Sequence, residues 1–224
     1  MIVVPIYDMI ILPGVTFYFK QDVFQELEIE DVKEGEELIF LYQKEDKERQ
    51  SLTAEDFYPI GVEGKVEGID RDGNINVRTF HRVDIHNIEV TEGNISLEAV
   101  NRDEIEDIDA QECQMRFEKM RTSLLRFAQG FQWGVWARSY ILHWKSISEV
   151  VSALSSYLNL TNEERYQIVE TDVLSQRIEK MEHAVYEFIE VTRVGEEAEN
   201  AQQERHEKVS VSYTHLRAHE TSAH

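Results

Sequence analysis

Hydrophobic positions follow two different periods along the chain, and the change falls near residue 102. Before it, apolar residues form compact runs or alternate with polar ones, as at Leu38–Tyr42 and Ile60–Ile69, which is typical of β-strands. From Asp103 onward there is no proline, and apolar residues recur every three or four positions, as on an amphipathic helix. The pattern predicts strands first and helices afterwards.

The first half carries about six short predicted strands. Arg71-Asp72-Gly73-Asn74 is the strongest pairing signal, because Asp-Gly favours the tight turn of a hairpin. Short strands joined by such turns imply a small barrel or a curled sheet. The apolar runs from which the strands are drawn are Ile2–Pro5, Met9–Leu12, Val15–Phe19, Leu38–Tyr42, Ile60–Ile69, Ile75–Val77, Val83–Ile88 and Ile95–Val100.

The second half carries helix signals both in its spacing and at helix starts. Ala110–Gly130 has apolar residues at helical spacing. Ser146–Leu158 opens with Ser146 and Glu149 in capping-box spacing, and Thr161 precedes acidic residues as the N-cap of a further helix. A heptad seam then predicts a helix that packs against another one; its members are Leu174, Ile178, Met181, Val185 and Phe188.

These periods predict an α+β protein in successive parts. A small β-barrel-like region occupies 1–102, a helical bundle 103–192, and the start of a polar connecting helix 193–210. The segment Val211–Thr221 reads like a frame translation of a common transposase-type sequencing adapter. We therefore expect 211–224 to be an artefact and the native frame to be interrupted near residue 210.

Charge and cysteine content limit which partners and which cellular compartment are expected. The 224 residues carry a formal charge of −21, which disfavours nucleic acid and anionic membranes as partners. Cys113 is the only cysteine, so no internal disulfide can form and a reducing compartment is expected. The N-terminus lacks a basic region, and no apolar stretch is long enough to span a bilayer. A soluble, cytoplasmic protein is the expectation.

No catalytic constellation stands out in the sequence. There is no Gly-x-x-x-x-Gly-Lys-Ser/Thr loop for a nucleotide and no Gly-x-Ser-x-Gly elbow. His215 and His219 are four residues apart, but they have no third ligand and lie in the adapter-like segment, and the other histidines lack the spacing of metal ligands. We therefore predict no catalytic, cofactor-binding or metal-binding residue, and binding of a partner remains as the function to locate.

Consecutive aromatic residues are the first candidates for binding. Phe17, Tyr18 and Phe19 cannot all face one side of a strand. They could contact hydrophobic stretches of a client polypeptide. Alternatively two are core residues and one is an ordinary exposed aromatic, and we favour this second interpretation.

Clustered tryptophans are the second candidates. Trp133 and Trp136 lie close to Trp144, and such clusters often mark contact surfaces. Their helical spacing and the neighbouring Tyr140 and Ile141 instead favour burial in the bundle core.

Three motifs occur in order in the first half. The segment Val3–Gly14 reads VVPIYDMIILPG and contains Pro5, Asp8, Pro13 and Gly14. The second, FYPIGV from Phe57, contains Pro59 and Gly61. The third, an Asp-Gly hairpin at Asp72 and Gly73, is followed by a strand with Arg82.

Together these motifs resemble the N-terminal substrate-binding domain of Lon-type ATP-dependent serine proteases (endopeptidase La). The family's opening is Leu-Pro-Leu-Arg-Asp-x-Val-x-Phe-Pro-Gly, and Tyr7 replaces its arginine. Thr79 stands where the family's last motif has glycine. The resemblance covers roughly residues 1–208 and implies a PUA-like barrel with a helix at Asp22–Glu30, followed by a bundle and the start of a long helix.

The resemblance also implies a function. Lon N-terminal regions capture unfolded or tagged polypeptides and help to hold a hexamer, as part of protein quality control. ATP, Mg²⁺ and the Ser-Lys dyad of the parent protease would lie beyond this chain. The alternative is a stand-alone adaptor that uses a Lon-like barrel to bind a peptide or a small ligand.

Overall fold

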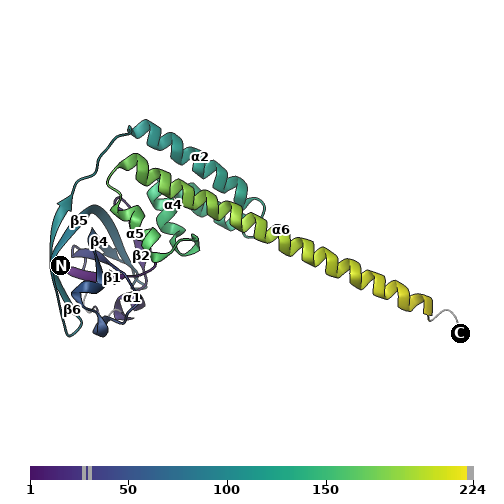
Figure 1. Ribbon diagram of the computed structural model, residues 1–224, viewed down its shortest axis with the longest axis horizontal. Helices are drawn as coiled ribbons and strands as arrows, with labels where there is room; N and C mark the ends of the chain where they lie inside the picture. Colours follow the sequence, from purple (N-terminus) through teal and green to yellow (C-terminus); the bar gives the residue numbers. More distant parts are fainter. Residues whose placement is uncertain (27–28, 30–31, 221–224) are drawn as a thin grey trace. The chain divides into compact units, whose positions relative to one another are not determined.

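The computed structural model describes residues 1–26, 29 and 32–220. The chain divides into a unit of residues Met1–Val185 and a second unit that begins at Tyr186. The first contains a six-stranded sheet and the helical bundle (Figure 1), and the second continues helix α6 (Leu174–Glu220). The α+β class is confirmed. Residues 221–224 of the adapter-like segment and 27, 28 and 30 of the helix expected at Asp22–Glu30 lie outside the described residues.

The sheet is mixed, with strand order β1-β3-β4-β5-β2 and β6 paired to β5. β1 runs parallel to β3, and the other neighbours are antiparallel. β5 pairs with β2 near its start and with β6 along the rest, and the sheet curls (Figure 1). The strands are β1 (Ile2–Ile6), β2 (Thr16–Phe19), β3 (Glu37–Gln43), β4 (Phe57–Ile69), β5 (Ile75–Thr91) and β6 (Asn94–Arg102).

The prediction of six strands is confirmed, but that of uniformly short ones is wrong. The runs Ile75–Val77 and Val83–Ile88 belong to the single 17-residue strand β5. Two polar residues between them, Thr79 and Arg82, are buried. They interrupt the hydrophobic alternation, so one strand reads as two in the sequence.

The apolar run Met9–Leu12 is buried without forming a strand. Its backbone groups bond to side chains instead of a neighbouring strand. The Ile10 N–H donates to Ser155 Oγ at 2.7 Å, and the Tyr42 hydroxyl donates to the Ile11 carbonyl at 2.6 Å. These bonds satisfy buried polar groups that a sheet would otherwise pair.

The helix starts that were predicted from caps agree with the structure more closely than the predicted ends. Asp109 caps α2, and Thr161 forms a full capping box with Glu164 at the start of α5. Ser146 caps α4, but the Glu149 carboxylate accepts the Lys145 N–H, and α4 ends well before the predicted Leu158. The helices are α1 (Gln21–Glu26), α2 (Ala110–Ala128), α3 (Gly134–His143), α4 (Ile147–Ala153), α5 (Asn162–Glu170) and α6.

The bundle core forms where α2 and the first turns of α6 run side by side (Figure 1). An ion pair of 2.6 Å between Arg116 and Glu182 joins the two helices. The heptad prediction holds here, because Ile178, Met181 and Val185 are buried. Burial of such a stripe supplies most of the stability of a surface helix.

Candidate functional site

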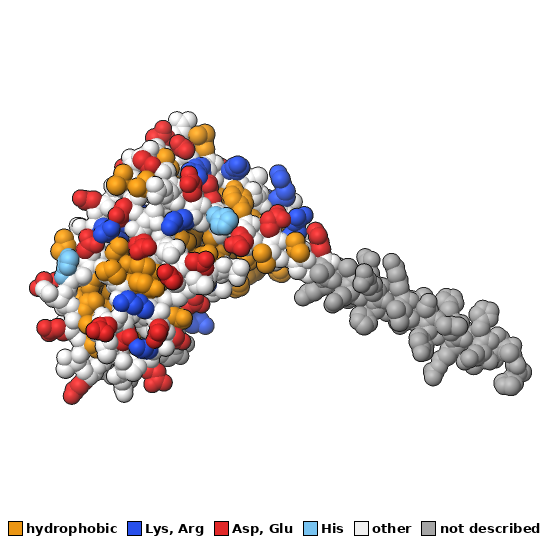
Figure 2. Space-filling view, in the orientation of Figure 1, with side chains coloured by type: hydrophobic (Ala, Val, Ile, Leu, Met, Phe, Trp, Pro, Cys, Tyr) orange, Lys and Arg blue, Asp and Glu red, His pale blue; other side chains and the backbone are white. Residues whose placement is uncertain are grey.

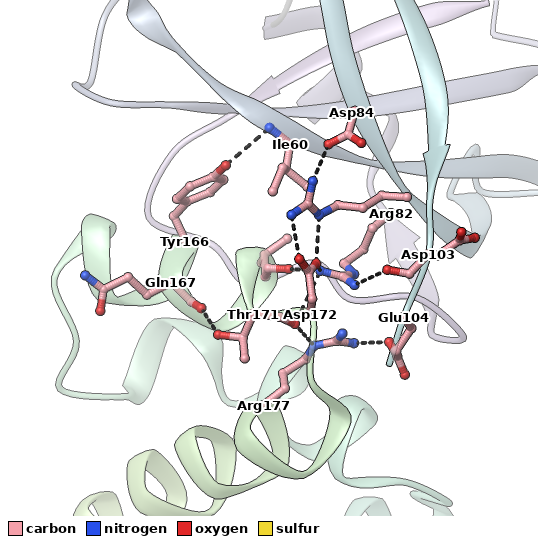
Figure 3. A network of polar contacts seen from close by, with 12 residues as sticks. Ile60, Arg82, Asp84, Asp103, Glu104, Tyr166, Gln167, Thr171, Asp172 and Arg177 are labelled. Atoms are coloured by element: carbon pink, nitrogen blue, oxygen red, sulfur yellow. Dashed lines mark hydrogen bonds and ion pairs between the residues drawn. The ribbon is translucent and has the colours of Figure 1, made fainter. Parts of the chain in front are cut away.

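The family-motif residue Arg82 joins the sheet to the helices (Figure 3). Its side chain is 1% exposed and reaches from β5 to the turn between α5 and α6. Nη1 donates to the Val169 carbonyl at 3.1 Å and to Asp172 Oδ1 at 2.8 Å, and Nη2 donates to the Asp103 carbonyl at 3.2 Å. A buried guanidinium needs such partners to offset its lost hydration.

Asp172 is the shared anion of this network (Figure 3). Arg102 on β6 binds both of its oxygens, at 2.7 and 2.6 Å, and also pairs with Asp84 at 2.6 Å. The hydrogen bonds from Arg102 and then from Arg82 hold the pKa of Asp172 below its ordinary value of 3.8. Asp172 is therefore an anion at neutral pH, and we call this ion-pair network the sheet–helix junction.

A second junction starts from the motif residue Asp8. Its carboxylate pairs with Arg165 at 2.5 Å, and its N–H donates to Asn162 Oδ1 at 2.9 Å. Arg165 is buried and also donates to the carbonyls of Ser155 and Leu158. Asp8 has a φ of +56°, which Asp tolerates better than most residues. Its role is to hold the N-terminal loop on α5.

The second motif, FYPIGV, forms the seat for α5. The Tyr166 hydroxyl accepts the Ile60 N–H at 3.2 Å, and the Tyr58 and Tyr166 rings stack at 3.9 Å. Pro59 lies opposite a register shift in the pairing of β3 with β4, where no ladder donor is needed. At Gly61 a Cβ would lie 2.8 Å from the Phe40 carbonyl oxygen, so the close strand approach excludes larger residues.

The remaining motif residues shape turns and strand edges. Thr79, where the family has glycine, keeps a negative φ in β5. Its hydroxyl accepts the Val15 N–H at 3.0 Å and donates to the Leu12 carbonyl at 2.6 Å, so it closes the loop that contains Pro13 and Gly14. The other motif residues lie in turns or on an edge strand. Gly14 (φ +77°) is in a turn, Asp72 and Gly73 (φ +83°) are in the hairpin, and Pro5 on the edge strand β1 lies opposite Leu41 on β3.

The β2 aromatics divide as we favoured. Phe17 and Phe19 are half-buried, with ring centroids 5.9 Å apart, and both pack on Phe40. Tyr18 points the other way and is 76% exposed. A single exposed aromatic is common on protein surfaces and is not by itself a site.

The expectation that the tryptophans are buried in the bundle core is wrong. Trp133 is 46% exposed and Trp136 is 68% exposed. Helix α3 contacts the bundle along a narrow stripe that contains Gly134 and Ile141, both buried. At Gly134 a Cβ would lie 1.8 Å from the Ala128 carbonyl oxygen. Glycine is therefore required for α3 to approach the end of α2 this closely, and this approach turns the tryptophans outward.

Large apolar side chains occupy the exposed side of α3. The rings of Trp136 and Tyr140 lie 4.6 Å apart, and Trp133 stacks on the half-buried Phe131 at 4.6 Å. Apolar residues thus lie both on the buried stripe of α3 and on its exposed side, which is typical of a helix that contacts a further partner. We call this surface the α3 apolar face; it consists of Trp133, Val135, Trp136, Tyr140 and Leu142.

Two observations concern metal binding and thiol chemistry in the described part of the chain. It holds no group of three His, Cys, Asp or Glu side chains arranged for a metal ion. Burial, with Glu112 and Asp109 nearby, raises the pKa of the Cys113 thiol, which opposes thiolate formation. Among the described helices, none has the length and apolarity to cross a membrane.

Comparison with known proteins assigns the family of the chain. The family model of the ATP-dependent protease La (LON) substrate-binding domain matches residues 1–185. The chain belongs to this family. A similar curated protein is the Lon protease of Clostridium beijerinckii, 24% identical over 179 residues, which are 78% of this chain and 22% of that protein. The chain thus matches about a fifth of the length of this relative.

A solved structure of a Lon N-terminal domain shares the fold. The N-terminal domain of a Mycobacterium avium complex Lon protease aligns with a TM-score of 0.51 at 19% identity, over 84% of this chain and 96% of that one. A Lon N-terminal domain protein from Xanthomonas campestris aligns with a TM-score of 0.43 at 14% identity, over 80% and 94%. Both the sheet–helix junction and the α3 apolar face lie within the part that the LON family model matches.

Proposed function

We propose that this chain recognises and binds unfolded or damaged protein substrates as the N-terminal part of a Lon-like ATP-dependent protease. The observation that carries the proposal is the α3 apolar face within a substrate-binding domain of this family. Unfolded polypeptides expose the apolar segments that folded proteins bury. Exposed Trp and Tyr side chains bind such segments well, since they bury a large area and lose little side-chain entropy.

The proposal is tested by measuring binding of the 224-residue chain to one protein in two states. Reduced and carboxymethylated α-lactalbumin serves as the unfolded client, and the native form serves as its folded counterpart. We expect micromolar binding to the unfolded form only. The double variant W136A/Y140A should weaken this binding at least about tenfold. Equal binding by the double variant and the unchanged chain would contradict the assignment to α3.

Tyr18→Ala is the matched control for the other aromatic candidate. Tyr18 is also a large exposed aromatic, but it stands alone on β2. We expect Y18A to bind the unfolded client as the unchanged chain does. A loss confined to Y18A would move the client site to β2 and its neighbours Phe17 and Phe19.

We further propose that the chain catalyses no step by itself. ATP and Mg²⁺ would serve other parts of the parent protease, which we expect to be a cytoplasmic hexamer acting in protein quality control. Cleavage of casein by the purified chain, with or without ATP, would contradict this. The purified 224-residue chain should bind casein and leave it uncleaved.

A stand-alone adaptor is the second candidate, and one cleft favours it. The cleft has a volume of about 380 Å³ and lies between α2, α4 and the first turns of α6. Apolar walls from Phe117 and Met181 line it together with charged side chains of both signs, among them Lys145 and Glu106. Arg177 is also in the lining, but it pairs with Glu104 at 2.5 Å. A cleft of this kind suits a small, largely apolar ligand. An adaptor that uses it would show a thermal shift with small apolar ligands and no preference for unfolded protein.

A further inference from the structure

The α3 apolar face lies in a part of the chain that carries no acid. Residues 119–148 contain five Lys and Arg residues and not one of the chain's 44 Asp and Glu residues. The formal charge of this segment is +5, while that of the whole chain is −21. Carboxylates are spread over the face of the molecule that Figure 2 shows. The segment around α3 therefore differs in charge as well as in exposed apolar area.

Most cations of this segment have no ion pair among the described residues. Arg121 pairs with Glu118 at 2.5 Å, as buried arginines such as Arg82 and Arg177 do with other carboxylates. The side chains of Arg126, Arg138 and Lys145 have no carboxylate partner in the described part of the chain, and all three are exposed. Their charges are thus available to a ligand.

These three cations surround the α3 apolar face. Arg138 lies on α3 itself, three residues after Val135 and four before Leu142. Arg126 is in the last turn of α2, next to Phe127, whose ring lies 6.1 Å from that of Trp133. Lys145 follows the end of α3 by two residues. Positive charge thus lies near both ends of α3 and, at Arg138, along the edge of the face beside Val135 and Leu142.

We propose that the α3 apolar face selects apolar client segments that are flanked by acidic residues. This inference rests on the proposed function and adds a charge preference to it. A ten-residue helix is about 15 Å long, which an extended segment of about five residues spans. The aromatic residues would contact that apolar segment, Arg126 and Lys145 would pair with carboxylates before and after it, and Arg138 would pair with a further carboxylate along the edge of the face.

A polypeptide fits these features better than an anionic membrane. Outside the α3 segment the chain is strongly acidic, so a negatively charged bilayer would repel most of the molecule at close range. A short peptide contacts only the face and its cations. The match to a substrate-binding domain family also favours a polypeptide ligand.

The test uses three peptides with one five-residue core of Leu and Phe, flanked by Asp/Glu, by Ser/Asn, or by Lys/Arg. Binding to the 224-residue chain is measured at low and at high salt. We expect the acidic-flanked peptide to bind about tenfold more tightly than the neutral one at low salt, because three exposed ion pairs together supply about that factor. The advantage should shrink at high salt, and the basic-flanked peptide should bind most weakly.

Two charge variants locate the effect. R126Q/R138Q/K145Q should remove the acidic preference and keep binding of the neutral peptide. K65Q/R71Q/R78Q removes three exposed cations on β4, on β5 and in the turn between them, and should leave the preference unchanged. The second variant controls for the change in net charge.

The remaining outcomes overturn the inference. Equal affinity for all three peptides would leave the proposed function intact and refute the charge preference. Tighter binding of the basic-flanked peptide would show that the net charge of −21 affects peptide binding more than the cations near α3 do. If no peptide binds and the chain sediments with anionic phosphatidylserine vesicles, the face is a membrane contact. Self-association that W136A abolishes, without peptide binding, would make it an interface between copies of the chain.

Discussion

The sheet–helix junction and the α3 apolar face use similar residue types for opposite purposes. At the junction, Arg82 and Arg102 share the Asp172 carboxylate, and Arg82 is almost completely buried. At α3, Arg138 is exposed beside large apolar side chains and has no carboxylate partner within the described residues. The junction is satisfied within the chain, whereas the α3 face has both apolar area and charge left for another molecule.

This difference indicates which residues act in folding and which in binding. The residues on which the sequence resemblance rests, such as Asp8, Gly61 and Arg82, hold the sheet, the loops and the helices together. The α3 face includes none of them. Substitutions should separate the two regions, because those at the junction should lower the free energy of unfolding, while those on α3 should lower affinity.

The largest loss of stability is expected for Arg82→Met. The substitution leaves the carbonyls of Val169 and Asp103 without a donor, and it removes one cation from Asp172. We expect the free energy of unfolding to fall by about 4 kcal/mol, measured by urea denaturation. Arg78→Met, an exposed position on the same strand, should cost less than about 0.5 kcal/mol. Equal losses for the two variants would contradict the role of the junction.

Gly134→Ala should have the next largest effect. Its Cβ would meet the Ala128 carbonyl oxygen at 1.8 Å, so α3 must move away from α2. We expect a loss of about 2–3 kcal/mol in thermal or urea unfolding. Gly195→Ala is the matched control, because no atom lies within 4 Å of its added Cβ. It should be neutral or slightly stabilising, as expected for alanine within a helix.

Asp172→Asn should cost about 2 kcal/mol at pH 7, less than Arg82→Met, because about a third of the side chain is exposed and solvent screens the pair. The pKa of Asp172 is lowered in the folded state from 3.8. The anion therefore stabilises the fold fully above about pH 5, and this contribution is lost as the pH falls through the lowered pKa.

The pH dependence of unfolding checks this sign. Urea midpoints of the unchanged chain and of D172N should differ at pH 7 and converge as the pH falls below 3.8. A difference that grows on acidification would contradict the account of Asp172 as a paired anion.

The smallest effect on stability is expected on α3. Trp136 and Tyr140 are more than half exposed, so W136A/Y140A should change the free energy of unfolding by less than about 0.5 kcal/mol. The same variant should lose affinity for unfolded protein. A stability loss as large as that of Gly134→Ala would show that these rings support the fold.

Local sequence signals predicted the strands and the helix starts well. The hairpin at Arg71–Asn74 and the cap at Thr161 depend on residues next to each other in the chain, which a sequence displays directly. The continuity of β5 was missed because the buried Thr79 and Arg82 find their partners far along the chain. A buried polar residue whose hydrogen-bond partner lies far along the chain leaves no pattern in the sequence around it.

The candidate site was predicted only in part. The sequence identified Trp133 and Trp136 as candidates, but their exposure depends on how α3 packs against α2 at Gly134. Gly134 lies between the two tryptophans in the sequence, but its close contact with Ala128 at the end of α2 appears only in the structure. The absence of acids from 119–148 was visible in the sequence, but its importance appeared only once the exposed apolar face was placed within it.

Photo-crosslinking of an unfolded client tests the central claim most directly. A benzoylphenylalanine residue would replace Trp136 in one preparation of the 224-residue chain and Tyr18 in another, both being exposed aromatics. On irradiation with reduced, carboxymethylated α-lactalbumin, we expect crosslinks from position 136, competed by acidic-flanked apolar peptide, and almost none from position 18. Crosslinks from position 18 alone, or none from position 136, would contradict the assignment of substrate binding to α3.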